Sequence, residues 1–167
     1  MKMKKVFTIM TLFAALAIVT ISCKDDKDPE EVSKNITGTD WAGYLTEEKK
    51  NGSSWEYNNQ RNYAVIHFNG TSTGTAVPTS GTGYQVEFSN EYMTEKTGFS
   101  NFSWKLEGGE LRMTYQTKGW DDTYIDYNDA TVTTTVFNGY MYDYTGNHRF
   151  RMELKANGSF DWSKWRE

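Results

Sequence analysis

Hydrophobic and polar residues alternate with a period of two along most of the chain after residue 37, and no window shows a convincing helical period. Strict alternation is typical of strands that bury one face. In the first such segment, Trp41, Gly43 and Leu45 share a face. In 84–89, Tyr84, Val86 and Phe88 alternate with polar residues, and the other alternating segments are 63–69, 102–106, 111–115, 124–127, 130–137, 140–142, 150–154 and 160–162.

Glycine-containing turns predict that neighbouring strands form hairpins. The clearest hairpin is FSWKLEGGELRMTY, residues 102–115, in which Gly108 and Gly109 can supply the positive φ that a tight turn needs. Its shared faces are Phe102, Trp104 and Leu106 on one strand and Leu111, Met113 and Tyr115 on the other. The pair Asn69-Gly70 predicts a second turn, followed by a weak strand that ends near residue 78.

Eight to ten short strands joined in sequence predict an all-β antiparallel meander. A meander of this length avoids exposed edges by closing into a barrel, here of about eight strands, although a β-sandwich is an alternative. Trp41 with Gly43 at the start, and the hairpin 102–115, resemble the lipocalin-like domains of small bacterial lipoproteins. The resemblance covers residues 38–162 and implies a lipocalin-like barrel in a single domain, residues 37–167.

The composition predicts a core that is built mostly from rings. Residues 23–167 contain 24 aromatic side chains but only 13 of leucine, isoleucine and valine together. Aromatic residues favour strands, and each buries a large area. Such a core could fill the barrel completely or leave space for one small ligand.

The N-terminus has the layout of an exported lipoprotein. Three lysines precede an uncharged apolar stretch at residues 6–21, which is short for a membrane-spanning helix. Ile21 and Ser22 before the only cysteine, Cys23, resemble a bacterial lipobox, although Thr20 departs from the usual leucine. We therefore expect residues 1–22 to be a signal peptide and Cys23 to be lipidated, because one cysteine cannot form a disulfide within the chain.

The residues after Cys23 bear on localisation. Lys24-Asp25-Asp26 resembles the acidic export signal of surface-exposed lipoproteins in some Gram-negative bacteria. We expect an outer-membrane protein, anchored by lipid at the cell surface, with the periplasmic face as the alternative. Residues 23–36 are expected to be the lipidated cysteine and a flexible tether, since they are charged and contain Pro29.

The net charge argues against nucleic acid and anionic lipid surfaces as partners. Without residues 1–22, which carry three lysines and no acid, 15 basic and 22 acidic residues leave a net charge of −7. An acidic domain without a basic stripe argues against nucleic acid. It also argues against electrostatic docking on anionic lipid, so the expected membrane contact is the covalent anchor alone.

The sequence offers little catalytic machinery. His67 and His148 lack zinc-ligand spacing; His67 is expected on the barrel exterior and His148 in an exposed turn. The acidic segment GWDDTYIDYND, residues 119–129, could contact a glycan or calcium, but it does not have the residue order of a calcium loop. Asp121 and Asp122 are also neighbours, so on a strand they cannot both face one ligand as a glycosidase pair would. We expect no enzymatic activity and no cofactor.

The sequence therefore predicts a protein that acts by binding. The first hypothesis is a barrel that holds a small apolar molecule or a glycan, and the candidate ligand contacts are Trp41, Trp55, Tyr57, Trp120, Asp122 and Tyr124. The alternative is a structural or protein-interaction lipoprotein with a solid barrel, working with other outer-membrane proteins, for example in glycan uptake.

Overall fold

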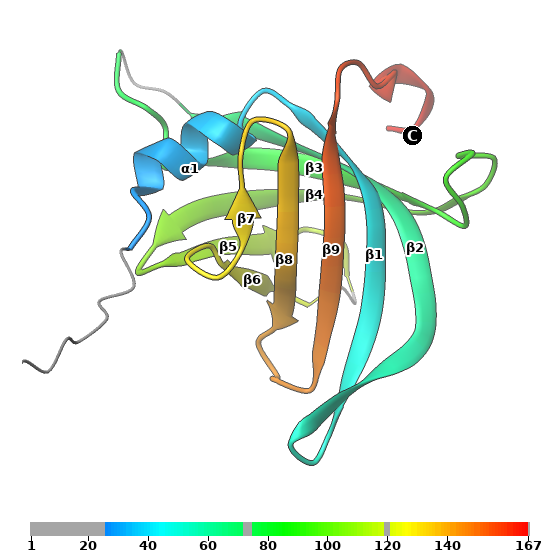
Figure 1. The fold of residues 1–167 in the computed structure, drawn as a ribbon. Helices are drawn as coiled ribbons and strands as arrows, with labels where there is room; N and C mark the ends of the chain where they lie inside the picture. Colours follow the sequence, from blue (N-terminus) through cyan, green and yellow to red (C-terminus); the bar gives the residue numbers. More distant parts are fainter. Residues whose placement is uncertain (1–25, 72–74, 119–120, 167) are drawn as a thin grey trace, which may run out of the picture.

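The computed structural model describes residues 26–71, 75–118 and 121–166. Within these residues, helix α1 (Pro29–Ile36) comes first, nine strands follow, and a short 3-10 helix, η1 (Trp162–Lys164), comes last (Figure 1). The strands are β1 (Asp40–Asn51), β2 (Ser54–Gly70), β3 (Ser80–Phe88), β4 (Lys96–Glu107), β5 (Glu110–Tyr115), β6 (Thr123–Asp126), β7 (Thr131–Val132), β8 (Val136–Asp143) and β9 (His148–Asn157).

The strands close into an antiparallel barrel. β1 to β6 pair in sequence, β9 pairs with both β1 and β8, and β6 pairs with β8 to complete the ring of eight. The two-residue strand β7 lies in the connection between β6 and β8 and pairs only with β8. The predicted all-β meander barrel of about eight strands, lipocalin-like in topology, is confirmed, and the sandwich alternative is wrong.

One of the two predicted turns is confirmed. Glu107 pairs with Glu110, and Gly108 and Gly109 between them have φ values of 60° and 85°. Asn69-Gly70, in contrast, makes no turn, because Gly70 still pairs with Gly81 at the end of β2. Hydrogen bonding along the ladder overrides the local turn preference of this pair.

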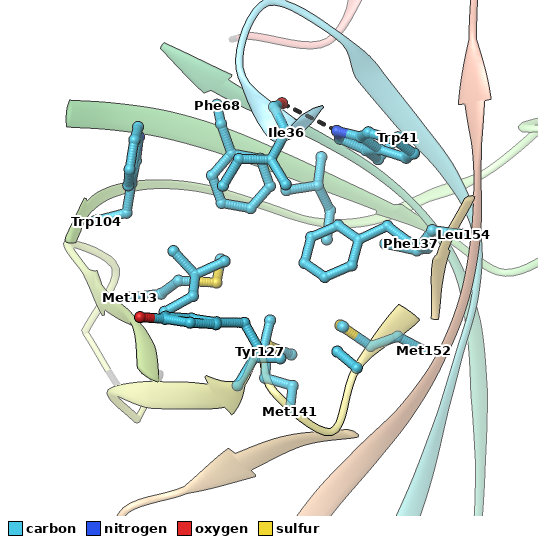
Figure 2. Close-up of a cluster of buried hydrophobic side chains, with 14 of the residues drawn as sticks. Ile36, Trp41, Phe68, Trp104, Met113, Tyr127, Phe137, Met141, Met152 and Leu154 are labelled. Atoms are coloured by element: carbon cyan, nitrogen blue, oxygen red, sulfur yellow. Dashed lines mark hydrogen bonds between the residues drawn. The ribbon is translucent and has the colours of Figure 1, made fainter. Parts of the chain in front are cut away.

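Aromatic side chains form part of the buried core inside the barrel. Trp41 is fully buried, donates a hydrogen bond from Nε1 to the Ile36 carbonyl at 3.0 Å, and meets the Phe137 ring edge-on at 5.7 Å (Figure 2). Phe68 packs between Phe102 and Trp104 in the same cluster. The predicted alternation of β1 and of the hairpin 102–115 is therefore confirmed.

Helix α1 covers the end of the barrel next to this core (Figure 1). Asp28 caps it by accepting the Glu30 N–H at 2.9 Å, and Val32 and Ile36, one turn apart, are buried among the rings. Before the helix, Lys27 donates to the carbonyl oxygens of Tyr127 and Ala130. The expectation of a flexible tether that extends to residue 36 is wrong for residues 29–36, because burial of Val32 and Ile36 stabilises a helix there.

A second apolar cluster lies outside the barrel, under the C-terminal segment. Phe160, Trp162 and Trp165 pack against the outer-face residues Ala42, Val65, Val86 and Phe88. Asp40 holds this segment by accepting the Trp162 Nε1–H at 2.8 Å and the Phe160 N–H at 3.0 Å, and it also bonds His67 Nδ1 at 2.7 Å. His67 is thus outside the barrel, as expected, whereas residues 160–162 lead into η1 and form no strand.

Candidate functional site: a polar cavity at the barrel mouth

The end of the barrel opposite α1 is open. A cavity of about 470 Å³ lies there, between the middle parts of β1 and β2, the last residues of β3, β5 and β8, and the first residues of β4, β6 and β9. This volume is within the range of small-molecule sites. The lining residues are Leu45, Glu47, Gln60, Asn62, Gln85, Glu87, Thr97, Gly98, Tyr115, Asp121, Thr123, Met141, Asp143, His148 and Phe150. We call this space the mouth cavity.

A chain of hydrogen bonds forms one wall of the mouth cavity. The Tyr115 hydroxyl donates to Gln85 Oε1 at 2.9 Å, and Gln85 Nε2 donates to Glu87 Oε1 at 2.8 Å. The other oxygen of Glu87 accepts from Asn62 Nδ2 at 2.7 Å. These bonds cross β5, β3 and β2 and fix the orientation of each polar group.

The opposite wall is also ordered by polar contacts. His148 Nδ1 lies 2.6 Å from Glu47 Oε1, and the Asp143 carboxylate accepts from the backbone N–H groups of Asn147 and His148, each at 3.2 Å. Asp143 Oδ2 also accepts from the Thr145 hydroxyl at 2.5 Å. His148, expected in an exposed turn, is instead the first residue of β9 and is partly buried, because its pairing with Glu47 draws it to the mouth.

The inward strand faces that form the apolar core also line the mouth cavity. Glu47 continues the inward series of Trp41, Gly43 and Leu45, and Asn62 precedes the inward residue Ala64. Sequence reasoning missed these residues, although polar residues at inward positions were the signal that could have found them.

In β3 the apolar and polar faces are reversed relative to the other strands. Gln85 and Glu87 point into the barrel, whereas Val86 and Phe88 are covered from outside by the C-terminal segment. Alternation alone therefore could not identify which face of this strand lines the cavity.

Tyr115 is the most strongly perturbed titratable group of the cavity. Burial raises the pKa of its hydroxyl well above the ordinary value near 10 for tyrosine. The nearby Glu87 carboxylate raises this pKa further. Tyr115 is therefore a neutral hydrogen-bond donor that holds Gln85 in place over the whole physiological range.

We predict that Tyr115 makes stability fall at high pH. In the folded state this phenol stays protonated above pH 10, whereas in the unfolded state it ionises near that pH. The unfolded state then binds fewer protons, so the free energy of unfolding decreases by about 1.4 kcal/mol per pH unit. In Tyr115→Phe this contribution is absent, and the variant loses about 1 kcal/mol at neutral pH because Gln85 Oε1 loses its donor.

Urea unfolding at pH 8, 10 and 11 measures this effect. The difference in stability between wild type and Tyr115→Phe should shrink above pH 10. Tyr92→Phe is the matched control, because it removes a phenol that is 78% exposed. A constant difference between wild type and Tyr115→Phe across the three pH values would contradict the prediction.

The structure places most of the sequence-predicted contacts outside the mouth cavity. Trp41 is in the core at the closed end, and Tyr57 is 57% exposed on the long β1–β2 hairpin. Trp55, on the same hairpin, has Arg149 over its ring at 4.5 Å. Tyr124 lies on the outer face, where its ring stacks on Tyr142 at 5.3 Å and partial burial raises its pKa.

The acidic segment is divided between two sides of the barrel wall. Asp121 lines the mouth cavity, whereas Asp122 lines an external groove together with Arg112 and Tyr144. Both residues precede β6, which begins at Thr123, so they lie in a loop and not on a strand. Cys23 and Trp120 lie outside the described residues.

The described part of the chain holds neither a metal cluster nor a spanning helix. Among these residues, no group of three or more His, Cys, Asp and Glu side chains is arranged to hold a metal ion. Within the same residues, no helix is long and apolar enough to cross a bilayer.

Comparison with known proteins gives no relative. The chain matches no protein-family model, and it matches no curated protein and no solved structure at a significant level. Fold and cavity therefore define its class: an eight-stranded antiparallel barrel, lipocalin-like in topology, with a buried apolar cluster under α1 and a cavity with many polar side chains at the mouth.

Proposed function

We propose that this protein binds a small polar ligand in the mouth cavity without transforming it. The observation that carries the proposal is the cavity itself, whose polar side chains are held in place by hydrogen bonds from neighbouring strands. Groups fixed in this way lose little freedom when a ligand binds. The polar lining favours a hydroxylated or charged ligand, including a glycan, over a purely apolar molecule.

Native mass spectrometry of protein purified from its host tests this proposal. Wild type should carry a non-covalent mass that is lost on denaturation. Gln60→Trp should lose most of it, because Gln60 is an exposed rim residue and a larger ring there fills the entrance. Tyr57→Trp, which adds the same ring on the exposed hairpin, is the control. Binding in the mouth cavity would be refuted if wild type carried no non-covalent mass, or if Gln60→Trp carried as much of it as wild type.

We further propose that the barrel is a lipid-anchored lipoprotein of the outer membrane, exposed at the cell surface. The support is the lipobox-like stretch before Cys23 and the acidic residues that follow it. Metabolic labelling with palmitate should mark wild type and leave Cys23→Ala unmarked. Digestion of intact cells with a protease should remove a surface-exposed barrel and spare one that faces the periplasm.

An outer aromatic patch gives the protein-interaction alternative its own support. The Arg149 guanidinium lies 4.5 Å from the Trp55 ring and 3.9 Å from the Tyr140 ring, and it pairs with Glu48 at 2.6 Å. Aromatic and arginine side chains are enriched in protein interfaces. A photo-crosslinker at Tyr140 should capture an outer-membrane protein in cells if this function holds, whereas one at Tyr92 should not.

A further inference from the structure

The charges around the mouth cavity are strongly one-sided. Four carboxylates line it, those of Glu47, Glu87, Asp121 and Asp143, and among the described lining residues no lysine or arginine opposes them. His148 is the single basic side chain of the lining, and it is engaged with Glu47. The lining therefore carries an excess of negative charge whatever the protonation state of His148.

Glu47, Glu87 and Asp143 are built into the wall, whereas Asp121 lies at the solvated rim. Glu47 is 8% and Asp143 is 5% exposed. The hydrogen bonds to Glu87 and Asp143 come from amide, hydroxyl and backbone groups, which orient a carboxylate without cancelling its charge. Charges that are partly removed from water interact strongly with an ion of opposite sign.

A hydroxyl lies among the carboxylates as a neutral polar group. Thr123 is 4% exposed and lines the cavity. Its hydroxyl interacts with the Tyr115 hydroxyl, and this contact lowers the pKa of the phenol against the larger effect of burial. A hydroxyl oxygen has two lone pairs, so Thr123 Oγ1 can still accept a bond from a ligand N–H.

The floor of the cavity is apolar. Leu45 and Met141 are each 3% exposed, and the rings of Phe150 and Tyr115 complete this surface. Aromatic faces also attract cations. The ligand that fits both features has an apolar body and a positively charged hydrogen-bond donor.

From these features we infer that the mouth cavity selects a small organic cation, a protonated amine on an apolar body. The ammonium group lies among the carboxylates of Glu47, Glu87 and Asp143, with Thr123 as a neutral acceptor, and the apolar body rests against Leu45 and Met141. This inference rests on the proposed function of the mouth and specifies the charge class of its ligand.

A matched set of three probes tests the inference: 2-phenylethylamine, 2-phenylethanol and phenylacetate, which share one body and differ in charge. Each is titrated into the full-length protein at pH 7 and low salt, with binding followed by NMR shifts. The amine should bind about tenfold more tightly than the alcohol, and phenylacetate most weakly, because only the amine offsets the carboxylates. Added salt should weaken the binding of the amine more than that of the alcohol.

Two charge-removing variants locate the effect. Glu87→Gln and Asp121→Asn should each weaken binding of the amine about fivefold more than binding of the alcohol. Asp121 is exposed at the rim, so Asp121→Asn tests the charge even if Glu87→Gln folds poorly. Glu153→Gln, which removes an exposed carboxylate that lines no part of the cavity, is the control.

The outcomes separate this inference from the proposed function. Equal or tighter binding of the alcohol or of phenylacetate, or a neutral sugar as the co-purified ligand, would overturn selection of a cation and leave binding in the mouth standing. Unchanged affinity for the amine in both variants would also overturn it. Failure of all three probes, together with a wild type that carries no ligand in native mass spectra, would overturn both.

Discussion

Trp41→Ala should lower the free energy of unfolding by about 3–5 kcal/mol, as is typical when a buried aromatic is truncated. The ring is fully buried and contacts Phe137, so its removal leaves a cavity. The Ile36 carbonyl also loses the Nε1–H donor that joins α1 to the barrel. Since most domains are stable by only about 5–15 kcal/mol, this loss is a large fraction of the total.

Urea unfolding monitored by circular dichroism measures the effect, with Trp41→Phe as the matched variant. Phenylalanine keeps an aromatic ring but lacks the donor, so it should cost clearly less than alanine. Ligand affinity of the folded Trp41→Phe variant should equal that of wild type, because Trp41 does not line the mouth cavity. A loss of affinity without a loss of stability would instead support the sequence-based assignment of Trp41 as a ligand contact.

Gly43→Ala should destabilise the barrel by about 3 kcal/mol. A Cβ atom at Gly43 would lie 2.0 Å from the carbonyl oxygen of Glu153, which is far inside van der Waals contact. That oxygen belongs to the backbone of β9, where Gly43 pairs with Leu154, so the clash can be relieved only by shifting a strand. Closure of the barrel between β1 and β9 thus depends on the absence of a side chain at this position.

Thermal unfolding is the simplest measurement for this variant. A loss of 3 kcal/mol corresponds to a fall of about 10 °C in melting temperature for a domain of this size. Gly158→Ala is the control, because a Cβ atom there meets no atom within 4 Å. Equal melting temperatures for Gly43→Ala and wild type would mean that β9 can move aside at no cost.

The strand pattern was readable from sequence because most strands bury one face against the ring-rich core. The hairpin 102–115 is the clearest case, since alternation and the Gly108-Gly109 turn agree with each other. The inward face of β3 was not readable, because the C-terminal segment covers the other face and turns Val86 and Phe88 into buried residues outside the barrel.

Helix α1 was missed because it has only two apolar residues on its buried face within a highly charged stretch. Its start signals were nevertheless present. Asp28 is a good N-cap, Pro29 suits the first helical position, and Glu31 three residues after the cap completes a capping-box spacing. Such local signals indicate where a helix begins, but only the tertiary contacts of Val32 and Ile36 decide that it forms.

The ligand contacts predicted from the sequence are mostly aromatic, whereas seven of the fifteen described residues that line the cavity are amides and carboxylates. Trp55, Tyr57 and Tyr124 are instead on the outside of the barrel. Which inward positions remain unfilled depends on side chains from eight strands together, so the alternation of one strand at a time does not locate the cavity.

The position of α1 has a consequence for how the molecule would stand on a membrane. Strand β2 runs from the mouth at Gln60 to Phe68 beneath the end of the helix, a distance of about 25 Å. Lys27, just before the helix, is bonded to Asn128 in the connection between β6 and β7. It is four positions along the chain from Cys23, a reach of about 14 Å at most. If acyl chains are attached to Cys23, this reach keeps the α1 end of the barrel near the lipid and leaves the entrance at the far end. A ligand would then arrive by diffusion through the surrounding water and would not pass sideways out of the bilayer.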